Sequence, residues 1–101
     1  MMSTKRACAS LEDVRAEIDE LDRAIVPLLA SRLDYALQAV RFKSTDEDVR
    51  AATRVERVVA NARELAREYG ANEAAVEKVY RALVAAMVEL EFAERSEARK
   101  G

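Results

Sequence analysis

Residues 10–43 read SLEDVRAEIDELDRAIVPLLASRLDYALQAVRFK and carry an apolar stripe along most of their length. Apolar residues recur at spacings of three and four, as on one face of a helix that packs against other helices; they are Leu11, Val14, Ile18, Leu21, Ile25 and Leu28. The same register places Arg32 where another apolar residue is expected. A cation at such a position needs an anion beside it, supplied by the protein or by a ligand.

The stretch predicts one long first helix, from Ser10 to about Lys43. Ser10 is a suitable N-cap residue, and acidic residues follow it in the first turn, where the helix dipole favours them. Pro27 interrupts the pattern, because an interior proline costs about 3 kcal/mol. The apolar register continues on both sides of Pro27, so we expect one kinked helix rather than two helices that meet there.

Two further helices are predicted after a polar connection, Ser44–Asp48. The second runs from about Arg54 to Tyr69 and is stopped by Gly70. The third is capped by Asn72 and runs to about Arg95. Their predicted inward faces comprise Val55, Val58, Val59, Ala62, Leu65, Ala66 and Tyr69 on the second helix, and Val76, Val79, Tyr80, Leu83, Val84, Met87 and Leu90 on the third. Both ends of the chain, Met1–Ala9 and the charged tail to Gly101, are expected to be frayed.

Composition indicates a single all-helical domain, residues 1–101, with its core at about 10–95. Half of the 101 residues are apolar, which excludes a disordered chain, and few Gly and Pro interrupt the helix formers. The net charge of −2 gives no electrostatic reason to expect nucleic acid as a partner. No apolar run approaches the roughly 20 residues that span a bilayer, so no membrane partner is expected.

Two residue types bear on chemistry and location. The chain has no histidine, which excludes metal sites and catalytic triads that depend on one. The single cysteine, Cys8, can form no internal disulfide, which favours a reducing, cytoplasmic setting. No segment near the start resembles a secretory signal. We therefore expect a cytoplasmic protein without a metal site or catalytic triad that depends on histidine.

The unequal lengths of the helices predict an oligomer. At 1.5 Å per residue the first helix is roughly 50 Å long, and the other two can cover only part of its apolar stripe. Because the remainder must meet another chain, the simplest expectation is a two-fold homodimer.

Five charged residues are candidates for a binding site: the cations Arg15, Arg32, Lys43 and Arg54, and the carboxylate Glu91 on the inward face of the third helix. Each also has an ordinary interpretation as a solvated surface residue, and Arg32 with Glu91 as a structural ion pair. Arg15 and Arg32 are 17 residues apart, or roughly 26 Å along a helix. If both bind one small ligand, Arg15 must therefore reach the site of a partner subunit.

The joint order of several short segments resembles the all-helical chorismate mutase family, whose members include isochorismate pyruvate lyases. The matching segments are Val14–Asp22, Ser31–Tyr35, Arg41–Lys43, Val49–Arg50, Arg54–Val55 and Val79–Glu91. Together they span about Leu11 to Phe92, nearly the whole chain. The resemblance implies an intertwined homodimer with two equivalent sites for a small dicarboxylate substrate, chorismate or isochorismate.

The resemblance also implies roles for the candidate residues. Arg15 would be supplied to the site in trans by the partner subunit. Arg32 and Arg54 match arginines that hold the carboxylates or ring side of the substrate, and Lys43 matches a lysine on the enolpyruvyl carboxylate and the ether oxygen. Glu91 falls where the family has Gln, or sometimes Glu, beside that ether oxygen.

Both reactions of this family are pericyclic and require neither nucleophile, metal nor cofactor, in keeping with the residues available. Chorismate mutase is our first expectation because it is the commoner activity of the fold, with isochorismate pyruvate lyase as the alternative. Mutases often carry acidic residues where this chain has Ala51 and Val55, whereas the lyase branch is apolar there; Glu91 fits some mutases better. A non-catalytic helical dimer or regulatory module is a more distant alternative.

Overall fold

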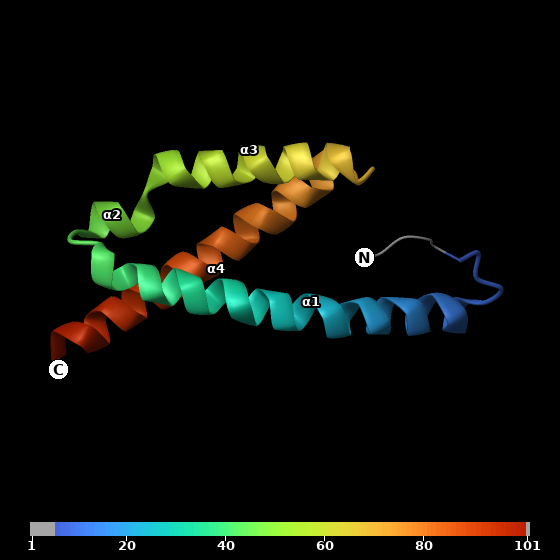
Figure 1. Ribbon diagram of the computed structural model, residues 1–101, viewed down its shortest axis with the longest axis horizontal. Coiled ribbons are helices and arrows are strands. Elements are labelled where there is room, and N and C mark those ends of the chain that lie inside the picture. Colours follow the sequence, from blue (N-terminus) through green and yellow to red (C-terminus); the bar gives the residue numbers. More distant parts are fainter. Residues whose placement is uncertain (1–5, 101) are drawn as a thin grey trace. The chain divides into compact units, whose positions relative to one another are not determined.

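The computed structural model describes residues 6–100, with side chains to residue 98, and every regular element in that range is helical. Figure 1 shows the order along the chain: α1 (Leu11–Ala39), the short 3₁₀ helix η1 (Val40–Phe42), α2 (Asp46–Arg50), α3 (Ala52–Glu68) and α4 (Glu73–Lys100). The prediction of an all-α chain with three main helices and a very long first helix is confirmed. The intertwined dimer stays a prediction.

α1 is a single helix that continues through Pro27, so the alternative of two helices meeting at the proline is wrong. Its start is as predicted: the hydroxyl of Ser10 accepts a hydrogen bond from the N–H of Asp13 at 3.1 Å. α1 ends at Ala39, four residues before the predicted end, and its last turn tightens into η1. Lys43 follows in an extended conformation and donates its N–H to the carbonyl of Val40 at 3.0 Å.

Part of each predicted tail lies within the described range. Residues 1–5 and Gly101 lie outside it. Arg6 contacts Glu17 at 3.0 Å, and the N–H of Ala9 donates to the Asp13 carboxylate at 3.2 Å. α4 continues to Lys100, five residues beyond the predicted end of the third helix, and fraying of the tail stays a prediction. The residues of that tail are good helix formers, and this propensity extends the helix.

The connection after Lys43 contains a helix that the sequence interpretation missed. α2 begins at Asp46 and is capped by Thr45, whose hydroxyl accepts from the Asp48 N–H at 3.1 Å while the Asp48 carboxylate accepts from the Thr45 N–H at 3.1 Å. This reciprocal pair is a capping box. Hydrogen bonds from the Ser44 and Thr45 N–H groups lower the pKa of Asp48. Ala51 then adopts a left-handed conformation (φ 38°) that separates α2 from α3.

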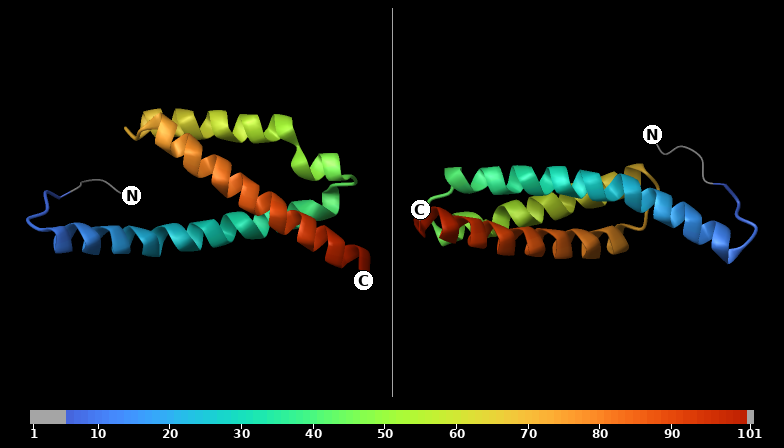
Figure 2. Two further views of the ribbon diagram at one scale, coloured as in Figure 1. Left: turned by 180° about the vertical axis from the view of Figure 1, so that it is seen from behind. Right: turned by 90° about the horizontal axis from the view of Figure 1, so that it is seen from below.

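α3 and α4 form a helical hairpin; in the left view of Figure 2 they meet at the turn that joins them and diverge away from it. Gly70 ends α3 with φ 72°, the left-handed conformation expected of a glycine at a helix end, and the Asn72 side chain accepts from the N–H of Ala75 at 2.8 Å. Both predicted turn signals are therefore confirmed. Three predicted core residues of α3, Val59, Ala62 and Ala66, are buried, as is Met87 on α4.

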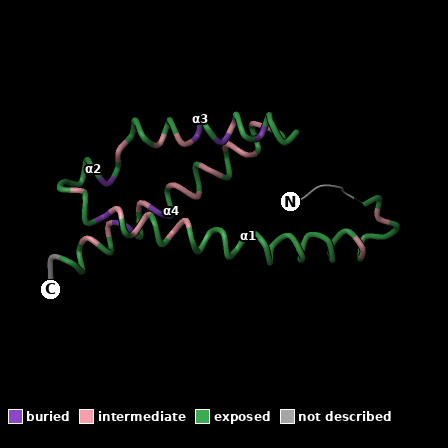
Figure 3. The backbone as a smooth tube through the Cα atoms, in the orientation of Figure 1, coloured by how far each residue is buried: buried purple, intermediate pink, exposed green. Residues whose placement is uncertain are grey.

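Several residues of the predicted inward faces are exposed instead: Leu65, Tyr69, Val79 and Leu90. The apolar stripe of α1 from Leu11 to Leu28 is exposed as well, and no residue of α1 is buried (Figure 3). These side chains lie on the apolar faces as predicted, but they are exposed in the described part of the chain.

The chain divides after Arg32 into two compact units, 1–32 and 33–101. No helix in the described range is long and apolar enough to cross a membrane.

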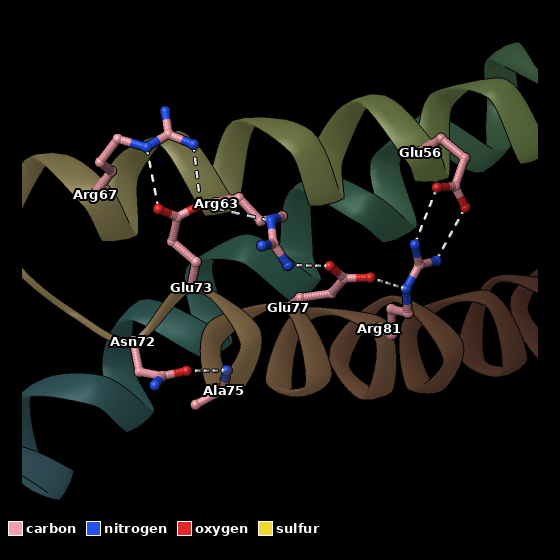
Figure 4. A network of polar contacts seen from close by, with 8 residues as sticks. All are labelled: Glu56, Arg63, Arg67, Asn72, Glu73, Ala75, Glu77 and Arg81. Carbon is pink, nitrogen blue, oxygen red and sulfur yellow. Dashed lines mark hydrogen bonds and ion pairs between the residues drawn. The ribbon is translucent and has the colours of Figure 1, made fainter.

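An ion-pair network joins α3 to α4 along the surface of the hairpin (Figure 4). Arg81 of α4 donates to Glu56 of α3 at 2.9 and 3.0 Å and to Glu77 at 2.8 Å. Arg63 donates to the other oxygen of Glu77 at 2.5 Å. The hydrogen bonds from Arg81 lower the pKa values of Glu56 and Glu77, with a further contribution from Arg63 at Glu77. The network therefore stabilises the hairpin only while the two carboxylates are ionised.

We expect the hairpin to lose stability in acid. The folded-state pKa values of Glu56 and Glu77 lie below the ordinary value of 4.5. Their contribution is thus fully present above about pH 4.5, and it is lost as the pH falls through the lowered values. Thermal unfolding measured between pH 6 and pH 3 should show a falling Tm, and Glu77→Gln should reduce that fall. Glu89→Gln, at an exposed position on α4, is the control; an equal reduction in both variants would contradict the prediction.

Candidate functional site

Lys43 and Glu91 meet in the unit formed by residues 33–101. The Lys43 ammonium donates to Oε1 of Glu91 at 2.5 Å, across 48 residues of sequence. The Lys43 side chain is 23% exposed and that of Glu91 only 8%. A hydrogen bond between two charged groups in such partial burial is among the stronger kinds, and it fixes both side chains. The structure thus brings together the two candidates that the sequence analysis placed beside an ether oxygen.

Glu91 is buried because of its position on α4. It lies one helical turn after the buried Met87, on the face that packs against the rest of this unit. A buried carboxylate needs a cation or several hydrogen bonds to offset its desolvation, and Lys43 provides the cation. This pairing resembles the structural ion pair considered from the sequence, with Lys43 observed as the partner. The Lys43 ammonium has three N–H groups, so it can contact an anionic ligand at this point in addition to Glu91.

Arg54 lies in the first turn of α3 and is exposed. The N-cap residue of α3 is Ala51, which makes no side-chain hydrogen bond to the first N–H groups of the helix. An exposed guanidinium next to uncapped amides is compatible with a carboxylate ligand. Its role as a substrate-binding residue stays a prediction.

Arg15 and Arg32 both belong to α1 and to the unit of residues 1–32. Arg15 is exposed and Arg32 is half-buried. Because α1 is continuous between them, their separation of roughly 26 Å along the helix stands. One small ligand bound within a single chain cannot touch both. Their assignment to one shared site, with Arg15 from a partner, stays a prediction.

Two cavities open in the unit of residues 33–101. One of about 600 Å³ lies beside Lys43 and is also lined by Gln38, Arg41 and Arg95. The other, of about 330 Å³, is lined by Val55 and by apolar residues of α4, with arginines as its only charged residues. Val55 is one of the two positions at which mutases of the family that this sequence resembles often carry an acidic residue. No carboxylate lines the cavity at that position.

One residue near Lys43 was missed by the sequence analysis. Arg95 donates from Nη2 to the carbonyl oxygen of Ser44 at 2.6 Å and pairs through Nη1 with Asp46. Its side chain is only 13% exposed, unusual for an arginine near a helix end. The available signal was its spacing, because Arg95 follows Glu91 by four residues and therefore shares its face of α4.

Residues 14–92 match the family model described as chorismate mutase type II. The chain therefore belongs to the chorismate mutase type II family, as the resemblance predicted. Among known proteins, it is similar to the isochorismate pyruvate lyase of Pseudomonas aeruginosa, with 32% identity over 83 residues that cover 82% of each chain. The two comparisons support an enzyme of this family.

Proposed function

We propose that the protein is a cofactor-free enzyme that catalyses a pericyclic reaction of chorismate or isochorismate. The observation that carries this proposal is the half-buried Lys43, held by a buried carboxylate in a chain of this family. In such a reaction the ether C–O bond breaks and its oxygen gains negative charge. An ammonium fixed beside that oxygen stabilises the charge without reorganisation. Arg15, Arg32 and Arg54 are proposed to hold the two carboxylates of the substrate in the compact reactive conformer.

Of the two reactions, we place isochorismate pyruvate lyase first, which reverses the order expected from the sequence. In that reaction a ring hydrogen moves to the enolpyruvyl methylene as the ether bond breaks, giving salicylate and pyruvate. Two observations support it: Ala51 and Val55 are apolar where mutases often carry an acidic residue, as in the lyase branch, and the relative from Pseudomonas aeruginosa is named for this activity.

Chorismate mutase is the second candidate, in which the ether bond breaks and a carbon–carbon bond forms to give prephenate. The description of the family model and the carboxylate of Glu91 at the ether position favour it. A purified sample offered chorismate and isochorismate separately distinguishes the two reactions by product: prephenate in one case, salicylate and pyruvate in the other. If a folded wild-type protein turns over neither compound, the proposal fails and a non-catalytic helical dimer or regulatory module takes its place.

The active form is proposed to be a homodimer in which α1 of each chain crosses to the other. The support is the uncovered apolar stripe of α1, which includes Leu11, Ile18 and Leu28 at 61%, 50% and 70% exposure. A second copy carries an equal stripe, and isologous pairing of two such helices would cover both. Sedimentation or light scattering on the purified protein measures the mass directly. The cytoplasmic location also stays a prediction, tested by cell fractionation.

We expect the side chain at position 91 to affect the rate of the reaction. A carboxylate repels an ether oxygen that gains negative charge, whereas an amide donates a hydrogen bond to it. If Glu91 lies beside that oxygen, Glu91→Gln should therefore keep or raise kcat.

Steady-state kinetics of Glu91→Gln measures this effect, with thermal unfolding alongside. If Glu91 only forms a structural ion pair with Lys43, the variant will be less stable, and its kcat, measured while it is folded, will fall.

A further inference from the structure

The turn that carries Lys43 is attached to α4 at two points one helical turn apart. Glu91 accepts a hydrogen bond from the Lys43 side chain at 2.5 Å. Four residues later, Arg95 reaches the same stretch of chain through the carbonyl of Ser44 at 2.6 Å and the carboxylate of Asp46. Residues four apart on a helix lie on one face. α4 therefore contacts both the side chain of Lys43 and the backbone immediately after it.

Arg95 is suited to fixing a backbone position. A guanidinium presents several N–H groups in a planar fork, so it can bind a carbonyl and a carboxylate at once, which an ammonium does with less geometric control. Its side chain is only 13% exposed, which separates it from surface arginines such as Arg67, which is 64% exposed. The bonded carbonyl belongs to Ser44, the residue directly after Lys43, so the contact restricts the backbone from which the lysine side chain extends.

The rest of the turn is ordered around the same contacts. The Asp48 carboxylate accepts from the N–H groups of Ser44 and Thr45 at 3.0 and 3.1 Å. The guanidinium of Arg50 lies 5.3 Å from the ring centroid of Phe92, the neighbour of Glu91 on α4. The segment thus has its own internal hydrogen bonds, and its orientation relative to α4 depends on the contacts that cross to that helix.

We propose that Arg95 is a positioning residue that acts through Lys43: by fixing the Ser44 carbonyl and Asp46 to α4, it keeps the Lys43 ammonium beside Glu91. The lysine stem has four rotatable bonds, and an ammonium stabilises a developing charge only if it is already in place. The catalytic consequence rests on the proposed function, whereas the restraint on the turn does not depend on it.

Arg95→Ala and Arg95→Lys test the proposal, with Arg63→Ala as the matched control. Arg63 is also an ion-paired arginine between two elements, but it belongs to the α3–α4 network. We expect Arg95→Ala to lower kcat about tenfold or more with a smaller change in KM, because misplacement of a catalytic group mainly affects the transition state. Arg95→Lys should restore part of the loss, and Arg63→Ala should leave kcat unchanged while lowering Tm.

The decisive comparison repeats Arg95→Ala in a Lys43→Ala background. If Arg95 acts through Lys43, it has nothing left to position there, and the second substitution lowers kcat no further. Full additivity of the two losses would overturn the proposal.

Amide hydrogen exchange of Ser44 and Thr45 gives a readout without substrate. Arg95→Ala should accelerate exchange at both amides, and Arg63→Ala should not. Should the wild type turn over neither chorismate nor isochorismate, the proposed function fails by itself. The positioning role is then judged by exchange alone, and unchanged protection of Ser44 and Thr45 overturns it.

Discussion

Lys43→Ala is expected to lower kcat by about 10²–10³-fold, the usual cost of removing one preorganised donor from a developing negative charge. The structure supports this size of effect because the Lys43 ammonium is only partly exposed and already held by Glu91. Its charge matters most when the ether bond breaks, so the loss should appear in kcat more than in KM. Steady-state kinetics on whichever of the two substrates is turned over provides the measurement.

The control for this variant is Lys78→Ala, because Lys78 is an exposed lysine of α4 away from Glu91. It should leave both kinetic constants near the wild-type values. Lys43→Ala also leaves the buried Glu91 without this partner, so its thermal unfolding must be measured to show that the variant is folded at the assay temperature. A change confined to KM in a folded Lys43→Ala protein would show that the lysine binds the ground state only.

A mixture of the two inactive variants Arg15→Ala and Arg32→Ala is expected to regain activity once their subunits exchange. The continuous α1 separates the two arginines by roughly 26 Å, so one substrate can meet both only if they come from different chains. In a mixed dimer, one site then combines the intact Arg32 of one chain with the intact Arg15 of the other. Random exchange should restore about a quarter of the wild-type number of sites, since half of the dimers are mixed and each has one complete site.

Subunit exchange is demonstrated separately, with two different affinity tags on the variants and isolation of the doubly tagged species. Each variant exchanged with itself is the control and should stay inactive. If the isolated mixed species has no activity, Arg15 does not act in trans, and the shared site is wrong even if the dimer exists.

Local sequence signals predicted the helices because each depends on residues close together in the chain. Ser10 caps α1, Asn72 caps α4, and Gly70 ends α3, as their residue types indicated. The unbroken register across Pro27 predicted one helix, and the structure has one. The short helix α2 was not predicted, because the acidic stretch after Lys43 was interpreted as a connection. Thr45 and Asp48 nevertheless have the spacing of a capping box.

The candidate site was predicted less completely, because its contacts join distant parts of the sequence. Periodicity placed Glu91 on an inward face, and the family resemblance placed Lys43 beside an ether oxygen. Neither showed that the two side chains would pair with each other across 48 residues. The attachment of Ser44 and Asp46 to Arg95, across about 50 residues, was not predicted at all.

The sequence by itself determined that the chain is helical, that its first helix is too long to be covered by the others, and which charged residues lie on apolar faces. These properties follow from spacing and propensity, which act over a few residues. Only the tertiary structure decided which cation offsets the buried carboxylate and which residue restrains the lysine. Those choices depend on how the turn after α1 meets α4, where desolvation of Glu91 must be balanced by whichever cation the packing brings within reach.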